Sequence, residues 1–434
     1  MYAREKMHLR SVPLVLAVEL TKAARSKAPI GKLTERIVQR ADEITELLAY
    51  YQLANGRKET KKLNKLSKQI QKGLSAAFNK FDEYQFAKYD RAAEVTLRDA
   101  LFLVHPKPKD ESQQALFDKI AKNELTVPYT WETELSAAGQ TKYKDEKERQ
   151  AAFRATWEAL IDSDRVGYMA LLRNLRNMLE AGVSAKHLEK VCSVLTDDAQ
   201  VARSKQLPFR FLSAYRELKS VKSGYTGLLL EALEAAALHS AANIRGFDSE
   251  TSVVIACDVS GSMQRSVSAK SKVQNFDVGL MLGMLLQSKC RNVITGMFGD
   301  RWKTISLPKR NVLANVMEFH RREGEVGYAT NGYLVIQDLL DRNVIVDKIF
   351  MFTDCQLWNT NGENIVKVWA KYKRIAPHAR LCLFDLAGYG NTPLKLSGNS
   401  DVFLVAGWSE KVFDVMAAIE EGQSAVKQID AVEL

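Results

Sequence analysis

The stretch Thr251–Gln264, TSVVIACDVSGSMQ, decides the fold of the second part of this chain. Residues 253–257 form an unbroken apolar run that is rich in β-branched side chains, which predicts a strand buried on both faces. The run ends at Asp258, and the glycine at position 261 favours a close turn out of the strand.

Similar runs follow, with helical segments between them. We expect further strands at 292–298, 347–354, 379–386 and 401–407, and helices near 272–288, 311–320, 332–340, 363–373 and 410–420. Alternating apolar strands and helices predict an α/β fold: a doubly wound, parallel, Rossmann-like sheet with helices on both faces. Ligands of such sheets bind beyond the carboxyl ends of the strands.

The chain before this stretch has a different pattern. Residues 1–246 show apolar side chains three and four positions apart, as in Leu33, Ile37 and Ile44, and glycine and proline divide them into pieces of helical length. We therefore predict an all-α domain over 1–246 and an α/β domain over 247–434. Successive helix pairs suit a HEAT-like solenoid, and a plain helical bundle is the alternative.

Composition places the chain among ordinary globular proteins. Of its 434 residues, 46% are hydrophobic and 26% are charged, which argues against general disorder. The longest unbroken apolar run, 12–18, is too short to cross a membrane, and no signal peptide is recognisable. The five cysteines form no CxxC pair. We therefore expect reduced thiols and a cytoplasmic protein.

Charge is distributed unevenly along the chain. Residues 1–246 contain 41 Lys and Arg against 31 Asp and Glu, whereas the remaining residues contain 21 of each. The whole net charge of +10 therefore belongs to the helical part. A basic domain beside a neutral one favours a polyanionic partner, most often nucleic acid; a surface that is cationic only for solubility is the alternative.

Oxygen donors follow two of the expected strands. Asp258, Ser260 and Ser262 come directly after the first strand, Asp354 ends the strand at 347–354, and Thr330 precedes a helix. Two carboxylates and three hydroxyls, without His or Cys, suit Mg²⁺ or Mn²⁺ better than zinc. The alternative is a strand-end carboxylate that caps the following helix.

The DxSxS pattern after a buried strand resembles the metal-ion-dependent adhesion site of the von Willebrand factor A domain. The resemblance implies that Asp258, Ser260, Ser262, Thr330 and Asp354 bind a divalent cation, which keeps one position open for an acidic group of a partner. Two positions depart from the family pattern. Tyr328-Ala329 replaces the glycine pair that often precedes the threonine, and Gln356 follows Asp354.

Basic residues cluster in two places in the helical part. Lys61, Lys65, Lys68 and Lys72 fall on one face of a helix, and no acidic residue interrupts the segment 60–81. The segment 86–109 adds Lys88, Arg91, Arg98, His105, Lys107 and Lys109. Lys and Arg contact phosphates, and histidine or an aromatic ring can stack on an unpaired base. A solvated helix face is the alternative. Arg173 and Arg176 form a smaller group, for which surface ion pairs are the simpler explanation.

The combination resembles the Ro autoantigen family, the TROVE-domain proteins, in a bacterial or phage form. The matching segments are LRDALFLVHPKP, MALLRNLRNM, LPFRFLSAYREL, ACDVSGSMQ and FTDCQ, in family order. The resemblance implies a monomeric ring of HEAT-like helices closed by the A domain. It also implies that small structured Y RNAs bind on an outer basic surface, and that single-stranded 3′ ends of misfolded RNA pass through the central hole. A further implication is cooperation with an exoribonuclease such as polynucleotide phosphorylase.

The family's RNA-binding residues carry over best to Lys88 and His105. Arg91 stands one position from a family arginine, which Ala92 replaces here, and Lys68 and Lys72 are weaker matches. The helical part is shorter than usual for the family, so we expect surface binding to be retained more readily than threading through a ring.

We therefore predict a non-catalytic RNA-binding protein that holds Y-like RNA and misfolded RNA in RNA quality control. The alternative is an interaction scaffold whose A domain binds an acidic partner residue through Mg²⁺. Catalysis is a weaker hypothesis, because no Walker phosphate loop and no Ser-His-Asp or Cys-His set is recognisable.

Overall fold

A computed structural model describes residues 1–23, 29–56, 66–90, 92–206, 209–241, 250–269, 271–357, 364–394, 400–408, 430 and 432. The chain divides into two compact units, Met1–Gln140 and Thr141–Glu421. We describe each unit separately.

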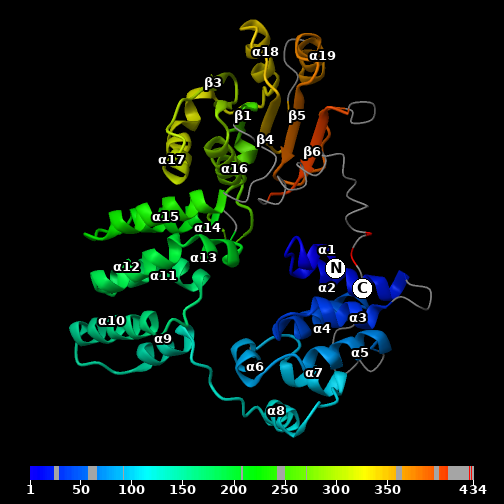
Figure 1. Cartoon of the computed structure of the whole chain (residues 1–434), viewed down its shortest axis with the longest axis vertical. Helices are drawn as coiled ribbons and strands as arrows, with labels where there is room; N and C mark the ends of the chain where they lie inside the picture. Colours follow the sequence, from blue (N-terminus) through cyan, green and yellow to red (C-terminus); the bar gives the residue numbers. More distant parts are fainter. Residues whose placement is uncertain are drawn as a thin grey trace. The chain divides into compact units, whose positions relative to one another are not determined.

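The first unit is helical (Figure 1). Its described helices are α1 (Tyr2–Glu5), α2 (Ser11–Ala23), α3 (Ile30–Ile37), α4 (Asp42–Ala54), α5 (Lys68–Phe78), α6 (Glu83–Tyr89), α7 (Leu97–Val104), α8 (Glu111–Lys122) and α9 (Trp131–Gln140). One hydrophobic core joins α2 through α8. Helices α3 and α5 pack very closely. A Cβ added at Gly73 would lie only 2.4 Å from the carbonyl oxygen of Gly31. Only glycine allows the two backbones to approach in this way.

The second unit begins with further helices. They are α10 (Glu146–Asp162), α11 (Tyr168–Glu180), α12 (Ala185–Thr196), α13 (Asp198–Ser204), α14 (Phe209–Lys219) and α15 (Thr226–Ala241). Among all described helices of the chain, none is long and apolar enough to cross a membrane.

A six-stranded sheet completes the second unit (Figure 1). Its strands are β1 (Ser252–Asp258), β2 (Asn292–Phe298), β3 (Trp302–Thr304), β4 (Lys348–Thr353), β5 (Arg380–Asp385) and β6 (Val402–Ala406), in the order β3-β2-β1-β4-β5-β6. All neighbouring pairs are parallel except β2 and β3. The predicted strands and doubly wound sheet are thereby confirmed, and β3 is a short antiparallel strand that the sequence pattern did not reveal.

Helices cover both faces of this sheet. They are α16 (Asn275–Lys289), α17 (Val312–Arg322), α18 (Tyr333–Asp341) and α19 (Ile365–Ile375), with 3₁₀ turns η2 (Gly261–Gln264) and η3 (Glu323–Val326). Val254 and Ala256 of β1 belong to a core cluster with α18 and α19. Ile255 and Cys257 face Gly283 of α16 on the opposite side. This alternation explains why β1 is apolar at every position.

The helical part and the sheet meet inside the second unit. The carboxylate of Glu234 on α15 accepts hydrogen bonds from the backbone N–H groups of Leu313 (2.7 Å) and Ala314 (3.0 Å), and so caps the first turn of α17. The last described helix before the sheet ends at Ala241, and β1 begins at Ser252. The boundary between the compact units, however, falls at 140/141, and not at the predicted domain boundary at 246/247.

Most predicted helices of the α/β part are present, with shifted ends. The helix expected at 410–420 lies outside the described residues. The region 311–340 holds α17 and α18 as expected, separated by η3.

Candidate functional site

The turn after β1 gathers three of the five predicted metal ligands. Asp258 is fully buried at the end of the strand, and its Oδ1 accepts a hydrogen bond from the backbone N–H of Ser260 at 2.8 Å. The hydroxyl oxygens of Ser260 and Ser262 are 3.1 Å apart. The chain therefore folds back so that one carboxylate and two hydroxyls point to the same place, as the DxSxS spacing predicts.

The second carboxylate comes from the neighbouring strand. Asp354 follows directly after β4, which pairs with β1, and it is fully buried. The hydroxyl of Thr353 donates to Oδ2 of Asp258 at 2.6 Å. In Asp354, Oδ1 accepts from the N–H of Gln356 at 3.1 Å, while Oδ2 is buried and has no hydrogen-bond partner among the described residues.

Thr330 lies at the same edge of the sheet, where it contacts the backbone after Asp354 and not a carboxylate. It is buried, and its hydroxyl donates to the carbonyl oxygen of Gln356 at 2.7 Å. The threonine loop and the Asp354 loop therefore lie in contact. Although Tyr328-Ala329 replaces the usual glycine pair, the loop that carries Thr330 still lies against the Asp354 loop. The Thr330 hydroxyl, however, donates to the backbone oxygen of Gln356.

The electrostatics of the site are those of a buried carboxylate pair without a counter-ion. Neither Asp258 nor Asp354 forms an ion pair with a described residue. Burial raises the pKa of Asp258 to about 7; hydrogen bonds from Thr353 and Ser260 act in the opposite direction, and the nearby Asp354 raises it further.

This donor set fits a hard divalent cation. Oδ2 of Asp354 has no hydrogen-bond partner among the described residues, and neither buried carboxylate has a counter-charge. A bound cation would supply both a partner and a positive charge, and carboxylate and hydroxyl oxygens suit Mg²⁺. No cluster of three His, Cys, Asp or Glu side chains occurs among the described residues, so the fit depends on the serine and threonine hydroxyls.

Two residues at the site were missed in the sequence. Thr353 holds Asp258, and its place directly before Asp354 at a strand end is the signal that could have indicated it. Asp385 ends β5 in register with Thr353, and its carboxylate accepts from the N–H groups of Gly388 (2.8 Å) and Gly390 (3.1 Å). Asp385 thus orders the loop beside the site.

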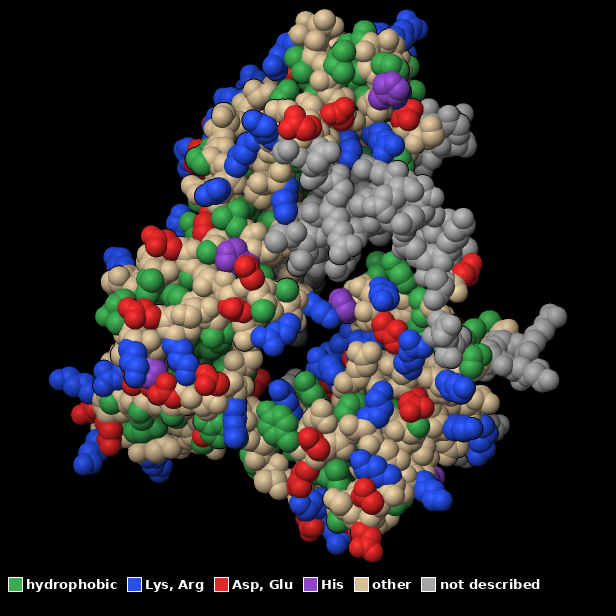
Figure 2. Space-filling view, in the orientation of Figure 1, with side chains coloured by type: hydrophobic (Ala, Val, Ile, Leu, Met, Phe, Trp, Pro, Cys, Tyr) green, Lys and Arg blue, Asp and Glu red, His purple; other side chains and the backbone are tan. Residues whose placement is uncertain are grey.

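The first unit brings four of the predicted RNA-binding residues together. Lys68 and Lys72 are exposed on α5. The neighbouring Gln71 donates to the carbonyl oxygen of Val104 at 3.1 Å, and Asn79 donates to that of Lys107 at 2.8 Å. The turn after α7, which carries His105 and Lys107, therefore runs along the lysine face of α5. Figure 2 shows Lys and Arg gathered over the part of this unit that holds α5.

An aromatic ring lies beside this cluster. Arg98, Phe102 and His105 are spaced four and three residues apart and are all exposed. Phe102 is 53% exposed, and the guanidinium carbon of Arg98 lies 5.9 Å from the centre of its ring. His105 adopts a left-handed conformation (φ 50°) that ends α7 and turns the chain toward Pro106. Phe102 was not predicted from the sequence, because an apolar residue within a helical segment gives no sign that its side chain is exposed.

Lys88 belongs to a second group. It is exposed on α6, and its Nζ lies 5.6 Å from the ring centre of Tyr84 and 5.8 Å from that of Tyr89. The guanidinium of Arg40 lies over the same Tyr89 ring at 4.5 Å. Arg91, and Lys61 and Lys65 of the predicted stripe, lie outside the described residues.

The candidate cations differ from other cations of the first unit in their pairing. Arg4, Arg36 and Lys119 pair with Glu43, Glu5 and Glu83. By contrast, the six described candidates form no ion pair with any described carboxylate: Lys68, Lys72, Lys88, Arg98, His105 and Lys107. The charges of the four lysines and of Arg98 are therefore available to an external anion.

Arg173 and Arg176 of α11 behave differently from each other. Arg176 pairs with Glu180 at 2.7 Å and with Glu217 at 3.0 Å, as the simpler explanation predicts. Arg173 is exposed and forms no ion pair with a described residue.

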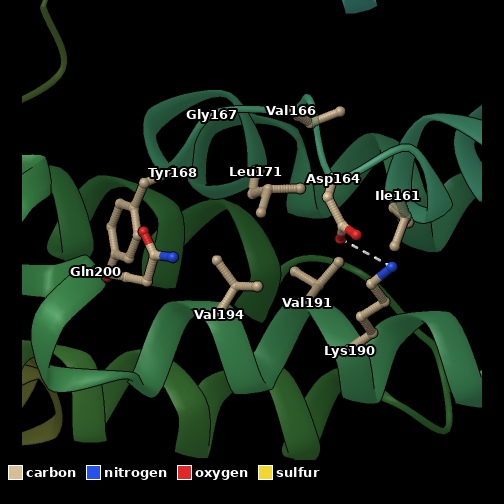
Figure 3. A pocket seen from close by; sticks show the side chains of 10 residues that line it. All are labelled: Ile161, Asp164, Val166, Gly167, Tyr168, Leu171, Lys190, Val191, Val194 and Gln200. Atoms are coloured by element: carbon tan, nitrogen blue, oxygen red, sulfur yellow. Dashed lines mark ion pairs between the residues drawn. The ribbon is translucent and has the colours of Figure 1, made fainter.

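A small cavity of about 310 Å³ lies in the second unit, between α10, α11 and α12 (Figure 3). Its walls include Ile161, Leu171 and Val191. The two charges at its edge, Asp164 and Lys190, pair with each other at 2.9 Å. The cavity therefore has no uncompensated charge with which to select a ligand.

A helical region followed by a doubly wound sheet with a DxSxS turn defines the class of helical proteins that carry a von Willebrand factor A-type domain. The family model described as "TROVE domain" matches residues 1–152 and 121–237, which together are more than half of the chain. The chain belongs to the TROVE-domain family.

Individual relatives agree with this assignment. The chain is 26% identical over 295 residues to telomerase protein component 1 of Mus musculus, and 26% identical over 293 residues to the Rattus norvegicus protein. Each match covers 51% of this chain and 11% of the relative. The chain thus spans about a tenth of the length of these curated relatives.

A solved structure matches most of the fold. The crystal structure of the Deinococcus radiodurans Ro (Rsr) protein is 18% identical, with a TM-score of 0.62. The match covers 95% of this chain and 87% of that one. The predicted resemblance to Ro proteins is confirmed at the level of family and fold.

Proposed function

We propose that this chain is a non-catalytic RNA-binding protein. Its ligands are small structured RNAs of the Y type and the single-stranded 3′ ends of misfolded RNA. Its role is RNA quality control or degradation together with an exoribonuclease such as polynucleotide phosphorylase. TROVE-family membership supports the proposal, and so does the surface of the first unit.

One observation carries the proposal. Five candidate cations of the first unit and His105 have no carboxylate partner among the described residues, and three of these cations lie with His105 along α5 and the turn after α7. Phosphates are the anions that such a surface would bind, because neutralising phosphates releases counter-ions and so favours binding entropically. The exposed Phe102 offers a ring on which an unpaired base can stack.

A salt titration tests the proposal. The full chain is titrated with a labelled structured RNA that bears a single-stranded 3′ tail. With about six phosphate contacts, the affinity should fall by about 10³-fold between 50 and 200 mM salt. Undetectable binding, or an affinity that does not change with salt, would contradict RNA binding through these residues.

A second function is supported by the A-type domain. The buried oxygen of Asp354 that lacks a partner favours a divalent cation, held by Asp258, Ser260, Ser262, Thr330 and Asp354. We propose Mg²⁺, with Mn²⁺ as a substitute. When bound, the cation supplies a coordination position for an acidic side chain of a partner protein. Pull-downs with and without EDTA test this: partners that depend on the metal should be lost with EDTA, while RNA binding should remain.

A further inference from the structure

One groove of the second unit has not yet been assigned a role. It has a volume of about 820 Å³ and lies between α11, α14, residues 267–268 and 271–273, and Trp408. Residues 267–268 and 271–273 come after the turn that carries Ser260 and Ser262, and Trp408 follows β6. This volume lies in the range of small-molecule and cofactor sites.

Basic side chains dominate the lining of the groove, but three of the five are already paired: Arg176 with Glu180 and Glu217, Lys272 with Glu217, and Arg216 with Asp277. The groove is lined by Arg173, Arg176, Arg210, Arg216 and Lys272, against one carboxylate. That carboxylate, Glu217, is already bound twice, by Arg176 at 3.0 Å and by Lys272 at 3.0 Å.

Two of the arginines keep their charge available. Arg173 and Arg210 are exposed, and neither forms an ion pair with a described residue. They come from neighbouring helices, since α11 packs on α14. Two guanidinium groups on one groove suit a phosphate, which Arg binds in a bidentate manner.

Aromatic rings line the same groove. Phe209 and Trp408 meet edge to face, with ring centres 4.7 Å apart. The guanidinium of Arg210 lies 5.1 Å from the ring centre of Phe209. Phe209 is buried whereas Trp408 is only half-buried, so the indole is the ring that a ligand can reach. An accessible indole beside cations suits a flat, aromatic ligand group such as a nucleobase.

We propose that this groove binds a nucleoside phosphate, with Arg173 and Arg210 on the phosphate and Trp408 against the base. The ligand chemistry is shared by a free mononucleotide and by the terminal nucleotide of an RNA strand. The inference does not depend on the cationic surface of the first unit, because all of its residues belong to the second unit.

Tryptophan fluorescence of the full chain tests the ligand class. AMP should quench the emission in a saturable way, and Trp408→Phe should remove that quenching. Adenosine, which lacks the phosphate, should bind at least tenfold more weakly than AMP, and inorganic phosphate should compete with AMP. Equal affinities for AMP and adenosine would overturn the assignment of the arginines.

Variants test the residues. Arg173→Ala with Arg210→Ala should weaken AMP binding at least tenfold, and fold should be retained because both side chains are exposed and form no ion pair. The matched control is Arg154→Ala with Arg203→Ala, two exposed arginines of the same unit outside the groove, and should leave the affinity unchanged. Equal loss in both double variants would indicate a general charge effect and would overturn the proposal.

A second ligand separates the two sources. A 5′-phosphorylated oligoribonucleotide of about six nucleotides is titrated beside AMP. If only the oligonucleotide binds, and binds more weakly to the Arg173/Arg210 variant, the occupant is a strand end. If AMP binds as well, the groove takes free nucleotides. If neither ligand responds to the variant, the proposal is wrong. Failure of the wild-type chain to bind structured RNA would remove the proposed function but not this inference.

Discussion

The guanidinium of Arg216 on α14 binds both carboxylate oxygens of Asp277 on α16, with a distance of 2.7 Å between Nη1 and Oδ2. Asp277 is fully buried in the first turn of α16, where its side chain also accepts from the backbone N–H of Gln274 at 2.9 Å. This ion pair connects the last helices before the sheet to the helix that covers β1. A bidentate pair with a fully buried carboxylate fixes geometry as well as contributing energy.

Arg216→Ala should therefore destabilise the second unit. Removing the arginine leaves the carboxylate of Asp277 buried without its cation, which costs about 2–4 kcal/mol. Urea unfolding, followed by tryptophan fluorescence, measures the free energy of unfolding. The control is Arg176→Ala, whose ion pairs with Glu180 and Glu217 are exposed and should contribute less than about 1 kcal/mol. Equal losses for the two variants would refute the importance of burial.

Lys72→Ala combined with Lys107→Ala should weaken RNA binding and lower its salt dependence. Each phosphate contact contributes about 0.7–0.9 to the slope of log affinity against log salt, so the slope should decrease by about 1.4–1.8. The control, Lys22→Ala with Arg36→Ala, removes the same charge from cations that already pair with Glu19 and Glu5. A control that changes the slope as much would show that only total charge matters.

Phe102→Ala should reduce the affinity for unpaired RNA. Stacking of one base on an aromatic ring contributes about 1–3 kcal/mol, which corresponds to roughly 5- to 150-fold in affinity. Because the charges are unchanged, the salt slope should stay constant, and Phe102→Tyr should retain most of the affinity. Binding assays with a single strand and with a duplex of equal length measure this. An equal loss for both ligands would argue against stacking.

Magnesium should stabilise the second unit. At a concentration 100-fold above its Kd, a ligand that binds only the native state contributes about 2.7 kcal/mol, or about 5 °C in Tm for a unit of this size. Asp354→Asn should abolish the shift, whereas Asp338→Asn, at a carboxylate that pairs with Arg342 on α18, should preserve it. A shift that survives Asp354→Asn would exclude the proposed site.

Acid should weaken the first unit through Glu83. The hydrogen bond from Lys119 (2.7 Å) and those from Thr126 lower the pKa of Glu83 to about 2 from an ordinary value near 4.5. The group therefore stabilises the native state above about pH 4.5, and this contribution is lost as the pH falls toward 2. Because Glu83 is partly exposed, we expect less than about 1 kcal/mol. Urea unfolding of wild type and Glu83→Gln should give a clear difference at pH 7, a smaller one at pH 3, and none once the pH falls below about 2.

The fold of the α/β part could be predicted well, because the signals are local. An apolar run such as 253–257 can be buried only between two layers of helices, and the end of such a strand is where Asp258 and Asp354 meet. Period and register are properties of adjacent residues, so one sequence is enough to read them.

Other features depend on partners that are distant in sequence. Nothing near Lys88 in the sequence indicates that Arg40 shares its tyrosine, so the spacing of basic residues could not predict this second group. Likewise, Arg173 and Arg176 look equivalent on one helix, but only Arg176 meets Glu217. The groove beside them depends on Trp408, more than 200 residues away, and no local pattern predicts that meeting.

The break between the compact units at 140/141 has a practical consequence for dissecting the protein. A fragment cut at the change from helices to strands would strip Glu234 from the first turn of α17 and Arg216 from Asp277. It would also uncover the apolar side chains with which α15 covers α16 and α17. Expression of the A-type domain alone should therefore yield aggregating material, and a soluble fragment should begin near Thr141.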